Sequence, residues 1–304
     1  MLRKDKSILF RLVGAMQFCP HPGQIAVLNA FIKYRFLCIV CGRRWGKTKI
    51  VSILSDYGLM EKDCKILCVS KTYKLAKKLW NYVLPDVQAL YGPGVLRVNK
   101  SDMIMESPWG SSLELASADN PDSMLGDAYD IVIDDEAATM KESIFQQNLL
   151  PMVRDRKGTL ILITTPRGHN WLHKIFQMGQ QLINGWWSRT GHSFENKAVY
   201  DDEEQKMVME QTDPLYFQQE YAASFIVFAD QVYPDFKEET HVVSKLPPDI
   251  DSWDLYVSID PGYAVMCAIV WIAYNKVSGQ MLIVDEVLRK HLKYNEIITE
   301  IRDR

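Results

Sequence analysis

The sequence predicts an α/β fold in which helices cover both faces of a parallel sheet. Short apolar runs alternate with helical patterns over the first two thirds of the chain, and two runs, Ile131–Asp134 and Thr159–Thr164, are almost continuous in Val, Ile and Leu. Strands buried on both faces have this composition. The 304 residues, 47% hydrophobic and 24% charged, are ordinary globular values and allow two domains.

The elements of this first part follow from changes of pattern along the chain. Met1–Phe18 predicts an amphipathic helix rather than a signal peptide, because Arg11 interrupts its apolar stretch and no cleavage site follows. Two alternating runs around Pro108-Trp109-Gly110 predict a hairpin of Asp102–Glu106 and Ser112–Ala116. Further expected strands are Phe36–Cys41 and Lys65–Ser70, and the expected helices are Lys47–Met60 and Tyr73–Tyr91.

The remaining chain changes character twice. Residues 186–229 are irregular and aromatic, with one helical run at Asp201–Gln211, and residues 230–253 carry several prolines among charges, as a linker does. A second α/β unit is then expected to open with strands Leu255–Asp260, Cys267–Tyr274 and Met281–Leu288 and a helix that begins near Tyr294.

Charge and cysteine content narrow the function classes. A formal charge of −3 and a pI near 6.1 exclude a small basic protein that coats nucleic acid, so any DNA contact needs a local patch. No apolar stretch approaches the roughly 20 residues that span a bilayer. The spacings Cys38/Cys41 and Cys64/Cys68 suggest zinc, but both pairs lie in expected strands, where cysteine is a small hydrophobe. Six reduced cysteines fit a cytosolic protein.

A candidate phosphate-binding loop lies between the first expected strand and its helix. The chain there reads Cys41-Gly42-Arg43-Arg44-Trp45-Gly46-Lys47-Thr48, which matches G-x-x-x-x-G-K-[ST] except that Cys41 replaces the first Gly. In such a loop backbone N–H groups face the phosphates, the lysine neutralises the β and γ oxygens and the hydroxyl ligates Mg²⁺. We expect Lys47 and Thr48 to take these roles.

A second motif ends a later strand in carboxylates. The run Ile131–Glu136 is apolar up to Asp134, Asp135 and Glu136, as in a Walker B strand. Asp135 is expected to hold Mg²⁺, and Glu136 to orient or deprotonate the attacking water. Alone, three acids at a strand end fit a solvated turn equally well. The phosphate loop upstream favours nucleotide hydrolysis, and Asp134 has no assigned role.

With both motifs in place, the chain resembles the large terminase subunit, the DNA-packaging motor of tailed bacteriophages and related viruses. Its loop looks like that family's variant Walker A, and Arg43 is expected to contact the γ-phosphate in cis because the loop places it there. The run Pro20-His21-Pro22-Gly23-Gln24 looks like the adenine-contacting segment, which would make Gln24 the base-recognising side chain. Thr164 and Thr165 look like the coupling motif, whose hydroxyls sense the γ-phosphate.

Three further stretches carry the resemblance. Ser70-Lys71-Thr72-Tyr73 follows the second strand as the family's motif does there, and Phe217–Tyr221 with Phe225 resembles the lid. Val257–Gly262 looks like the first strand of an RNase H-like nuclease, with Asp260 as its first metal-binding carboxylate.

The resemblance implies a P-loop NTPase fold of the RecA/ASCE-like type and a DNA translocase. Its domains would be an ATPase core (1–185), a lid (186–229), a linker (230–253) and the incomplete start of a nuclease (254–304). ATP and Mg²⁺ are the implied cofactors of the motor, and Mg²⁺ or Mn²⁺ those of the complete nuclease. Implied partners are double-stranded DNA, a portal ring, a small terminase subunit and further copies of the chain in a ring on the procapsid, in the host cytoplasm, with no membrane.

Two departures from the family pattern leave roles open. Leu125 stands where relatives often carry an arginine finger, and Arg154 and Arg156 are alternatives to it, although solvated loop arginines are the simpler interpretation. A two-metal nuclease needs at least three converging carboxylates. Only Asp260 matches, and Asp285 and Glu286 are more simply an exposed strand-end pair. The chain as given is not expected to cut DNA.

Other residues have simpler structural interpretations. His169 and His173 are expected as surface or capping residues rather than a metal pair, and Trp186-Trp187 as packing residues rather than a base-stacking platform. Lys74, Lys77 and Lys78 form a basic strip that either tracks DNA phosphates or is a solvated helix face.

Two rival functions remain. A cellular helicase or repair ATPase would need a second RecA-like domain, which the Asp260-Pro261-Gly262 start of the second unit argues against. A non-hydrolysing nucleotide-binding assembly factor would show no turnover.

Overall fold

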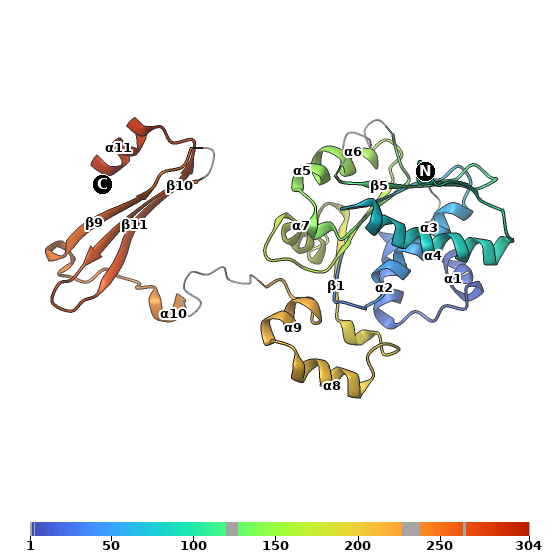
Figure 1. Ribbon diagram of the computed structural model, residues 1–304, viewed down its shortest axis with the longest axis horizontal. Helices are drawn as coiled ribbons and strands as arrows, with labels where there is room; N and C mark the ends of the chain where they lie inside the picture. Colours follow the sequence, from blue (N-terminus) through green and yellow to red (C-terminus); the bar gives the residue numbers. More distant parts are fainter. Residues whose placement is uncertain (1, 3, 120–126, 227–237, 264–265, 304) are drawn as a thin grey trace. The chain divides into compact units, whose positions relative to one another are not determined.

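The computed structural model describes residues 2, 4–119, 127–226, 238–263 and 266–303. The chain divides into two compact units, residues 1–228 and 229–304. The first is built on an eight-stranded sheet with the order β3-β4-β5-β2-β6-β7-β1-β8 (Figure 1). All neighbours from β5 to β8 run parallel, and β3, β4 and β5 pair antiparallel at one edge. The predicted α/β fold with a mainly parallel sheet is confirmed.

The strands of this sheet agree closely with the apolar runs of the sequence. Their bounds are β1 Phe36–Cys41, β2 Lys65–Ser70, β3 Arg97–Asn99, β4 Ile104–Glu106, β5 Ser112–Ser117, β6 Ile131–Asp135, β7 Thr159–Thr164 and β8 Trp186–Gly191. The predicted hairpin is present as β4 and β5. Two strands, β3 and β8, were not predicted.

The strand β8 requires a correction. Residues 186–229 were expected to form a lid outside the core, but Trp186–Gly191 pairs with β1 over its whole length as the edge strand of the sheet. The Trp186 side chain is buried and stacks on Phe36, with ring centroids 5.2 Å apart. The packing role expected for this tryptophan is thus observed. The other domain boundaries stay predictions.

Helices cover both faces of the sheet, as Figure 1 shows. The helices of the first unit are α1 Lys6–Ala15, α2 Pro22–Lys33, α3 Lys47–Met60, α4 Tyr73–Tyr91, α5 Glu142–Ile144, α6 Leu150–Met152, α7 Trp171–Gln180, α8 Asp202–Gln211 and α9 Pro214–Glu220. A π-helical stretch, Phe145–Leu149, joins α5 to α6. Short 3₁₀ turns lie at Ala137–Thr139, Ile183–Gly185 and Ser193–Glu195. The N-terminal helix is shorter than the sequence predicts, since α1 spans 10 residues.

Alternate residues of each central strand supply two separate cores. In β1, Leu37 and Ile39 pack in the cluster formed with α1 to α4, whereas Cys38 and Val40 pack in the cluster formed with α5 to α7. Helix α3 approaches the sheet closely at Gly58, where an added Cβ would come within 2.7 Å of Ile66. This packing fixes the direction of α3 and therefore the loop that precedes it.

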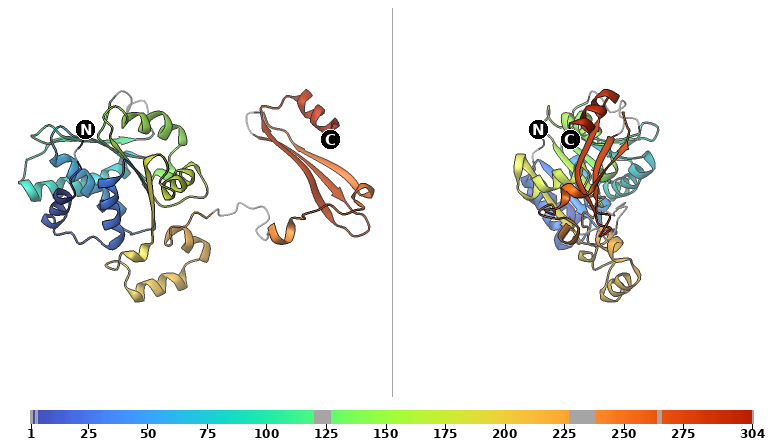
Figure 2. Two further views of the ribbon diagram at one scale, coloured as in Figure 1. Left: turned by 180° about the vertical axis from the view of Figure 1, so that it is seen from behind. Right: turned by 90° about the vertical axis from the view of Figure 1, so that its left-hand side faces the viewer.

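The segment after β8 leads out of the sheet into α8 and α9, which are drawn in yellow and orange at the lower part of the first unit (Figure 2). An aromatic group that includes Phe194, Tyr200, Phe217 and Tyr221 joins α9 to the segment that precedes α8. These are the residues of the predicted lid.

The second unit is an antiparallel meander. Its strands β9 Asp254–Asp260, β10 Met266–Tyr274 and β11 Met281–Lys290 pair in the order β11-β10-β9, followed by α11 Tyr294–Arg302. Its remaining helical turns are α10 Glu238–His241 and Ile250–Ser252. Cys267, Ile269, Trp271 and Val287 form its small core. The three predicted strands and the helix are confirmed, whereas their assignment to a nuclease stays a prediction.

Candidate functional site

The candidate phosphate loop connects β1 to α3 at the carboxyl edge of the parallel sheet. Gly46, the N-cap of α3, has a φ of 100°, which a residue with a side chain rarely adopts. An added Cβ there would also meet the Gln24 amide at 2.4 Å. The loop therefore ends in a tight turn that presents the N-terminus of α3, where backbone N–H groups and the helix dipole favour an anion.

A cleft of about 1180 Å³ opens in front of this loop. Its volume is ample for a mononucleotide. Seven basic side chains and two acidic ones line it. The lining residues are Arg43, Arg44, Trp45, Gly46, Lys47, Thr48, Lys49, Lys71, Leu75, Lys78, Tyr82, Glu136, Thr139, Thr165, Arg167, Tyr200, Glu220 and Tyr221. This excess of positive charge suits a polyphosphate.

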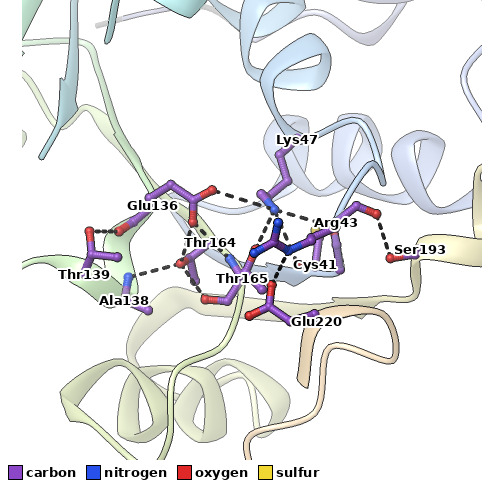
Figure 3. A network of polar contacts seen from close by, with 11 residues as sticks. Cys41, Arg43, Lys47, Glu136, Ala138, Thr139, Thr164, Thr165, Ser193 and Glu220 are labelled. Atoms are coloured by element: carbon purple, nitrogen blue, oxygen red, sulfur yellow. Dashed lines mark hydrogen bonds and ion pairs between the residues drawn. The ribbon is translucent and has the colours of Figure 1, made fainter. Parts of the chain in front are cut away.

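Lys47 lies where the loop meets the ends of β6 and β7 (Figure 3). Its ammonium donates to Thr165 Oγ1 at 2.8 Å and is 3.9 Å from Glu136 Oε1. The strand order explains this meeting, because β1, β7 and β6 are successive neighbours and their carboxyl ends share one edge. Of the three predicted acids, Glu136 is the one that lies near the Lys47 ammonium, and the roles assigned to both residues stay predictions.

Asp135 is the carboxylate beside this contact. Its side chain is almost fully buried, and burial together with the neighbouring Glu136 raises its pKa to about 6, although Lys47 and Lys78 act in the opposite direction. A buried carboxylate without a close cationic partner is the kind of ligand that a divalent cation stabilises. Asp134 points to the other face, where it is fully buried, and burial raises its pKa as well.

The two threonines of the predicted coupling motif contact Glu136 directly. The Thr165 N–H donates to Glu136 Oε2 at 3.4 Å, and the Thr164 hydroxyl lies 3.4 Å from the same oxygen. The Ala138 N–H donates to Thr164 Oγ1 at 3.2 Å, which ties β7 to the turn after β6. Glu136 itself adopts a φ of 69°, a left-handed conformation that is unusual outside glycine. Such strain is often stored at functional sites.

Arg43 turns toward α9. Its guanidinium donates through Nε to Glu220 Oε2 at 2.6 Å, and its backbone N–H donates to the Glu220 carbonyl at 2.7 Å (Figure 3). The hydrogen bond that Arg43 donates to the Glu220 carboxylate raises the pKa of Arg43. The expected contact between Arg43 and a γ-phosphate stays a prediction.

Other predicted residues surround the cleft without lining it. Gln24 is 3% exposed, and its amide donates to the Gly46 carbonyl at 3.5 Å, so it lies beneath the loop. Cys41 is fully buried at the end of β1, and burial raises the pKa of its thiol. Gly42 donates from its N–H to the Gly191 carbonyl of β8. The roles assigned to these residues stay predictions.

The sequence did not reveal that Lys71 and Lys78 line the same cleft. Lys71 follows β2, which neighbours β6 in the sheet, and Lys78 lies in the second turn of α4. The expected strip of lysines on α4 is exposed, as predicted, at Lys74, Lys77 and Lys78. The adjacency of β2 and β6 in the sheet, which brings α4 and Lys78 toward this site, is not visible in the sequence pattern.

The arginine finger remains unassigned. Leu125 lies outside the described residues. Arg156 donates to the buried Asp130 carboxylate at 2.8 Å and to the Asp63 carbonyl, so it has a structural partner at the amino end of β7. Arg154 is exposed in the same loop.

The predicted nuclease residues are exposed in the second unit. Asp260 ends β9. In the register of the meander it shares a face with Glu286, two strands away, whereas Asp285 pairs with Trp271 on the other face. Within the part of the chain that the structure describes, no three His, Cys, Asp or Glu residues come close enough to hold a metal ion. His169 and His173 of the first unit stack on each other at 4.3 Å, with His169 before α7 and His173 within it.

The chain is similar in sequence to the large terminase subunits of several phages. The family model "Terminase large subunit, T4likevirus-type, N-terminal" matches residues 38–237. The large terminase subunit of Escherichia phage T5 is 30% identical over 279 residues, which cover 88% of this chain and 63% of that protein. The large terminase subunit of Thermus virus P23-45 is 28% identical over 255 residues, 74% of this chain and 52% of that protein. The chain thus spans between about half and two thirds of the length of these curated relatives.

Solved structures share the fold. The ATPase domain of the Thermus phage P74-26 large terminase superposes with a TM-score of 0.63 at 21% identity, covering 74% of this chain and 100% of that one. The large terminase of another thermophilic bacteriophage, in complex with ADP, superposes with a TM-score of 0.59 at 16% identity, covering 94% of this chain and 73% of that one. Among the helices of the described residues, none combines the length and apolarity that a membrane span requires.

Proposed function

Because the chain belongs to the large terminase subunit family, we propose that it is an ATP-hydrolysing motor that moves double-stranded viral DNA into a procapsid. The observation that carries the proposal is the position of the Lys47 ammonium, 2.8 Å from Thr165 Oγ1 and 3.9 Å from the Glu136 carboxylate. It brings together Lys47 of the loop, Glu136, which is proposed as the general base, and Thr165 of the proposed coupling motif.

The chemistry proposed is attack of water on the γ-phosphate. Lys47 would neutralise the β and γ oxygens while the N–H groups at the start of α3 bind the phosphates. Glu136 would accept the proton of the attacking water, since Glu136 lines the cleft and its carboxylate is held by Thr164 and Thr165. Thr48 and Asp135 offer the oxygen ligands for Mg²⁺, which when bound would neutralise charge on the phosphates.

Coupling to movement would pass through the same contacts. Lys47 and Glu136 each bond Thr165, so loss of the γ-phosphate would change what both side chains contact. Arg43 joins the loop to α9 through Glu220, which gives the lid a direct link to the phosphate site. A change of ligand at the loop would therefore shift the position of the lid.

The partners proposed come from the family. They are double-stranded DNA, a portal ring, a small terminase subunit and further copies of the chain in a ring, in the host cytoplasm. Residues 254–304 would open an RNase H-like nuclease, with Asp260 as a ligand for Mg²⁺ or Mn²⁺.

The decisive measurement is ATP turnover with and without linear duplex DNA. We expect Glu136→Gln to reduce turnover by about 10² to 10⁴, the usual contribution of a general base, while ADP affinity stays near that of the wild type. Glu142→Gln, an exposed acid on the nearby α5, is the matched control and should keep full turnover.

Two outcomes would contradict the motor. If the rate of ATP turnover is the same with and without DNA and is kept by Glu136→Gln, hydrolysis does not depend on Glu136 and is not coupled to DNA. Absence of turnover in the wild type, with Glu136→Gln only retaining nucleotide longer, would favour a non-hydrolysing assembly factor.

A further inference from the structure

Four successive carbonyl groups of the phosphate loop each contact a side chain from outside the loop. Ser193 and Asn196 come from the segment after β8, and His21 and Gln24 come from the start of α2. The pairs are Ser193 Oγ to Arg43 O (2.7 Å), Asn196 Nδ2 to Arg44 O (2.8 Å), His21 Nε2 to Trp45 O (2.9 Å) and Gln24 Nε2 to Gly46 O (3.5 Å).

These contacts set which way the peptide groups of the loop face. All described peptide bonds are trans, so the N–H of each following residue points away from the carbonyl that is held. Holding the carbonyls of residues 43–46 therefore directs the N–H groups of residues 44, 46 and 47 to the opposite side of the chain, whereas the Trp45 N–H donates to the Gly42 carbonyl at 3.4 Å. None of the four side chains lines the cleft, so they hold the loop from behind. Converging N–H groups are what bind phosphate in such a loop.

The side chains that hold the loop are themselves fixed. Ser193 is fully buried, and its N–H donates to the Tyr221 carbonyl at 2.9 Å, next to the carbonyl of Glu220 that accepts from Arg43. His21 packs edge-on against Trp45, with ring centroids 4.8 Å apart, and Trp45 Nε1 donates to Glu195 at 3.1 Å. Both sets of contacts thus connect the loop to elements distant in sequence.

We propose that Ser193, Asn196, His21 and Gln24 are positioning residues that orient the N–H groups of the loop toward a bound polyphosphate. The proposal rests on the proposed function, because it presumes that the loop binds nucleotide phosphates. It also assigns the segment after β8 to the phosphate site, since two of its side chains hold the loop directly. In this role Gln24 holds the Gly46 carbonyl of the loop through its side-chain amide.

Binding of MgADP and of inorganic pyrophosphate, measured by calorimetry on the full chain, tests the proposal. Ser193→Ala and Asn196→Ala should each weaken both ligands by the same factor, about fivefold to tenfold, which is the usual effect of one lost hydrogen bond. Ser193→Thr keeps the hydroxyl donor and should restore the affinity. Asn196 is partly solvent-exposed, so its variant is expected to fold even where Ser193→Ala does not.

Ser188→Ala is the matched control. Ser188 is a buried serine on β8 whose hydroxyl donates to the Phe176 carbonyl at 2.6 Å, away from the loop. It should lower the melting temperature about as much as Ser193→Ala and leave both affinities within about twofold of wild type.

The outcomes separate this inference from the function on which it rests. If the wild type binds both ligands and the two loop variants behave like Ser188→Ala, the positioning role is wrong and the motor proposal stands. If the wild type binds neither ADP nor pyrophosphate, both fall together.

Discussion

The Lys47 ammonium is the group through which the phosphate loop, the β6 acids and the β7 threonines interact. The ammonium contacts Thr165, lies near Glu136 and belongs to a side chain that lines the cleft. In the low-dielectric surroundings of a half-buried site, one such charge acts more strongly on a phosphate than it would in water. The exposed cations at the mouth, Lys71, Lys78 and Arg167, add to the same field.

Two motifs predicted Lys47, Asp135 and Glu136 from the sequence, and the family resemblance added Thr164 and Thr165. Contacts that depend on how distant segments pack were missed. The partner of Arg43 was not predicted, since Glu220 is far away in sequence and only the folded chain brings it to the loop. Gln24 was found by resemblance, but its contact with the loop backbone depends on packing that no motif encodes.

Asp134 gives a prediction about stability and pH. Both its carboxylate oxygens are buried and have no hydrogen-bond partner among the residues that the structure describes, and burial raises its pKa well above the usual value. The native chain therefore binds this proton more tightly than the unfolded chain, so its contribution becomes increasingly destabilising as pH rises above about 4. Asp134→Asn removes the titration and should raise the melting temperature by a few degrees at pH 8, with little change at pH 4.

Thermal unfolding of both chains at the two pH values measures this difference. Asp155→Asn, in the exposed loop before β7, controls for the loss of one negative charge and should change little. A gain of equal size at both pH values would argue against titration of Asp134 as the cause.

At the scale of elements, β8 shows what pattern reading cannot detect. Its six residues, Trp186–Gly191, hold no run of β-branched residues, and it follows a turn with left-handed backbone at Leu182 and Asn184. It is a strand because it pairs with β1 and because Trp186 stacks on Phe36. The buried strands β1, β2, β6 and β7 were predictable, since both of their faces are apolar and composition alone identifies them.

The contact between Arg43 and Glu220 links the loop to α9 and can be measured. Burial raises the pKa of Glu220, but hydrogen bonds from Arg43 and Gln219 more than offset this and leave its pKa below the usual value. Arg43→Ala would strand a carboxylate that is 8% exposed, so it should lower the free energy of unfolding more than Glu220→Gln does. Because the Arg43 side chain is 56% exposed, we expect a coupling of only about 1 kcal/mol in the double-mutant cycle.

Urea unfolding of the two single variants and the double variant gives this coupling. The exposed pair Lys206 and Glu210, 3.9 Å apart on α8, is the comparison and should couple by at most about 0.5 kcal/mol. Equal coupling in the two pairs would mean that the lid is not held by Arg43.

For the whole molecule, the division into two units shows which residues form the cleft: they all belong to the first unit. Every residue that lines the cleft lies between Arg43 and Tyr221, inside the first unit of residues 1–228. The run of three strands after residue 254 predicted the second unit. Because β8 was not predicted, the expected lid (186–229) starts with a strand that belongs to the sheet. The core clusters of the first unit involve only its own residues.

A chain of residues 1–228 should therefore fold and bind MgADP with a dissociation constant within about twofold of that of the 304-residue chain. Its sheet keeps every strand pair from β3 to β8, and both cores that fix α3 and the loop stay complete. Calorimetry with ADP and a thermal melt of both chains measure this. Lys47→Ala in the shorter chain is the control; it should abolish ADP binding while the chain still unfolds cooperatively, with a melting temperature lowered only by the lost contacts to Thr165 and Glu136. Loss of ADP binding in the well-folded shorter chain would show that the phosphate site needs residues 229–304 and is not complete within the first unit.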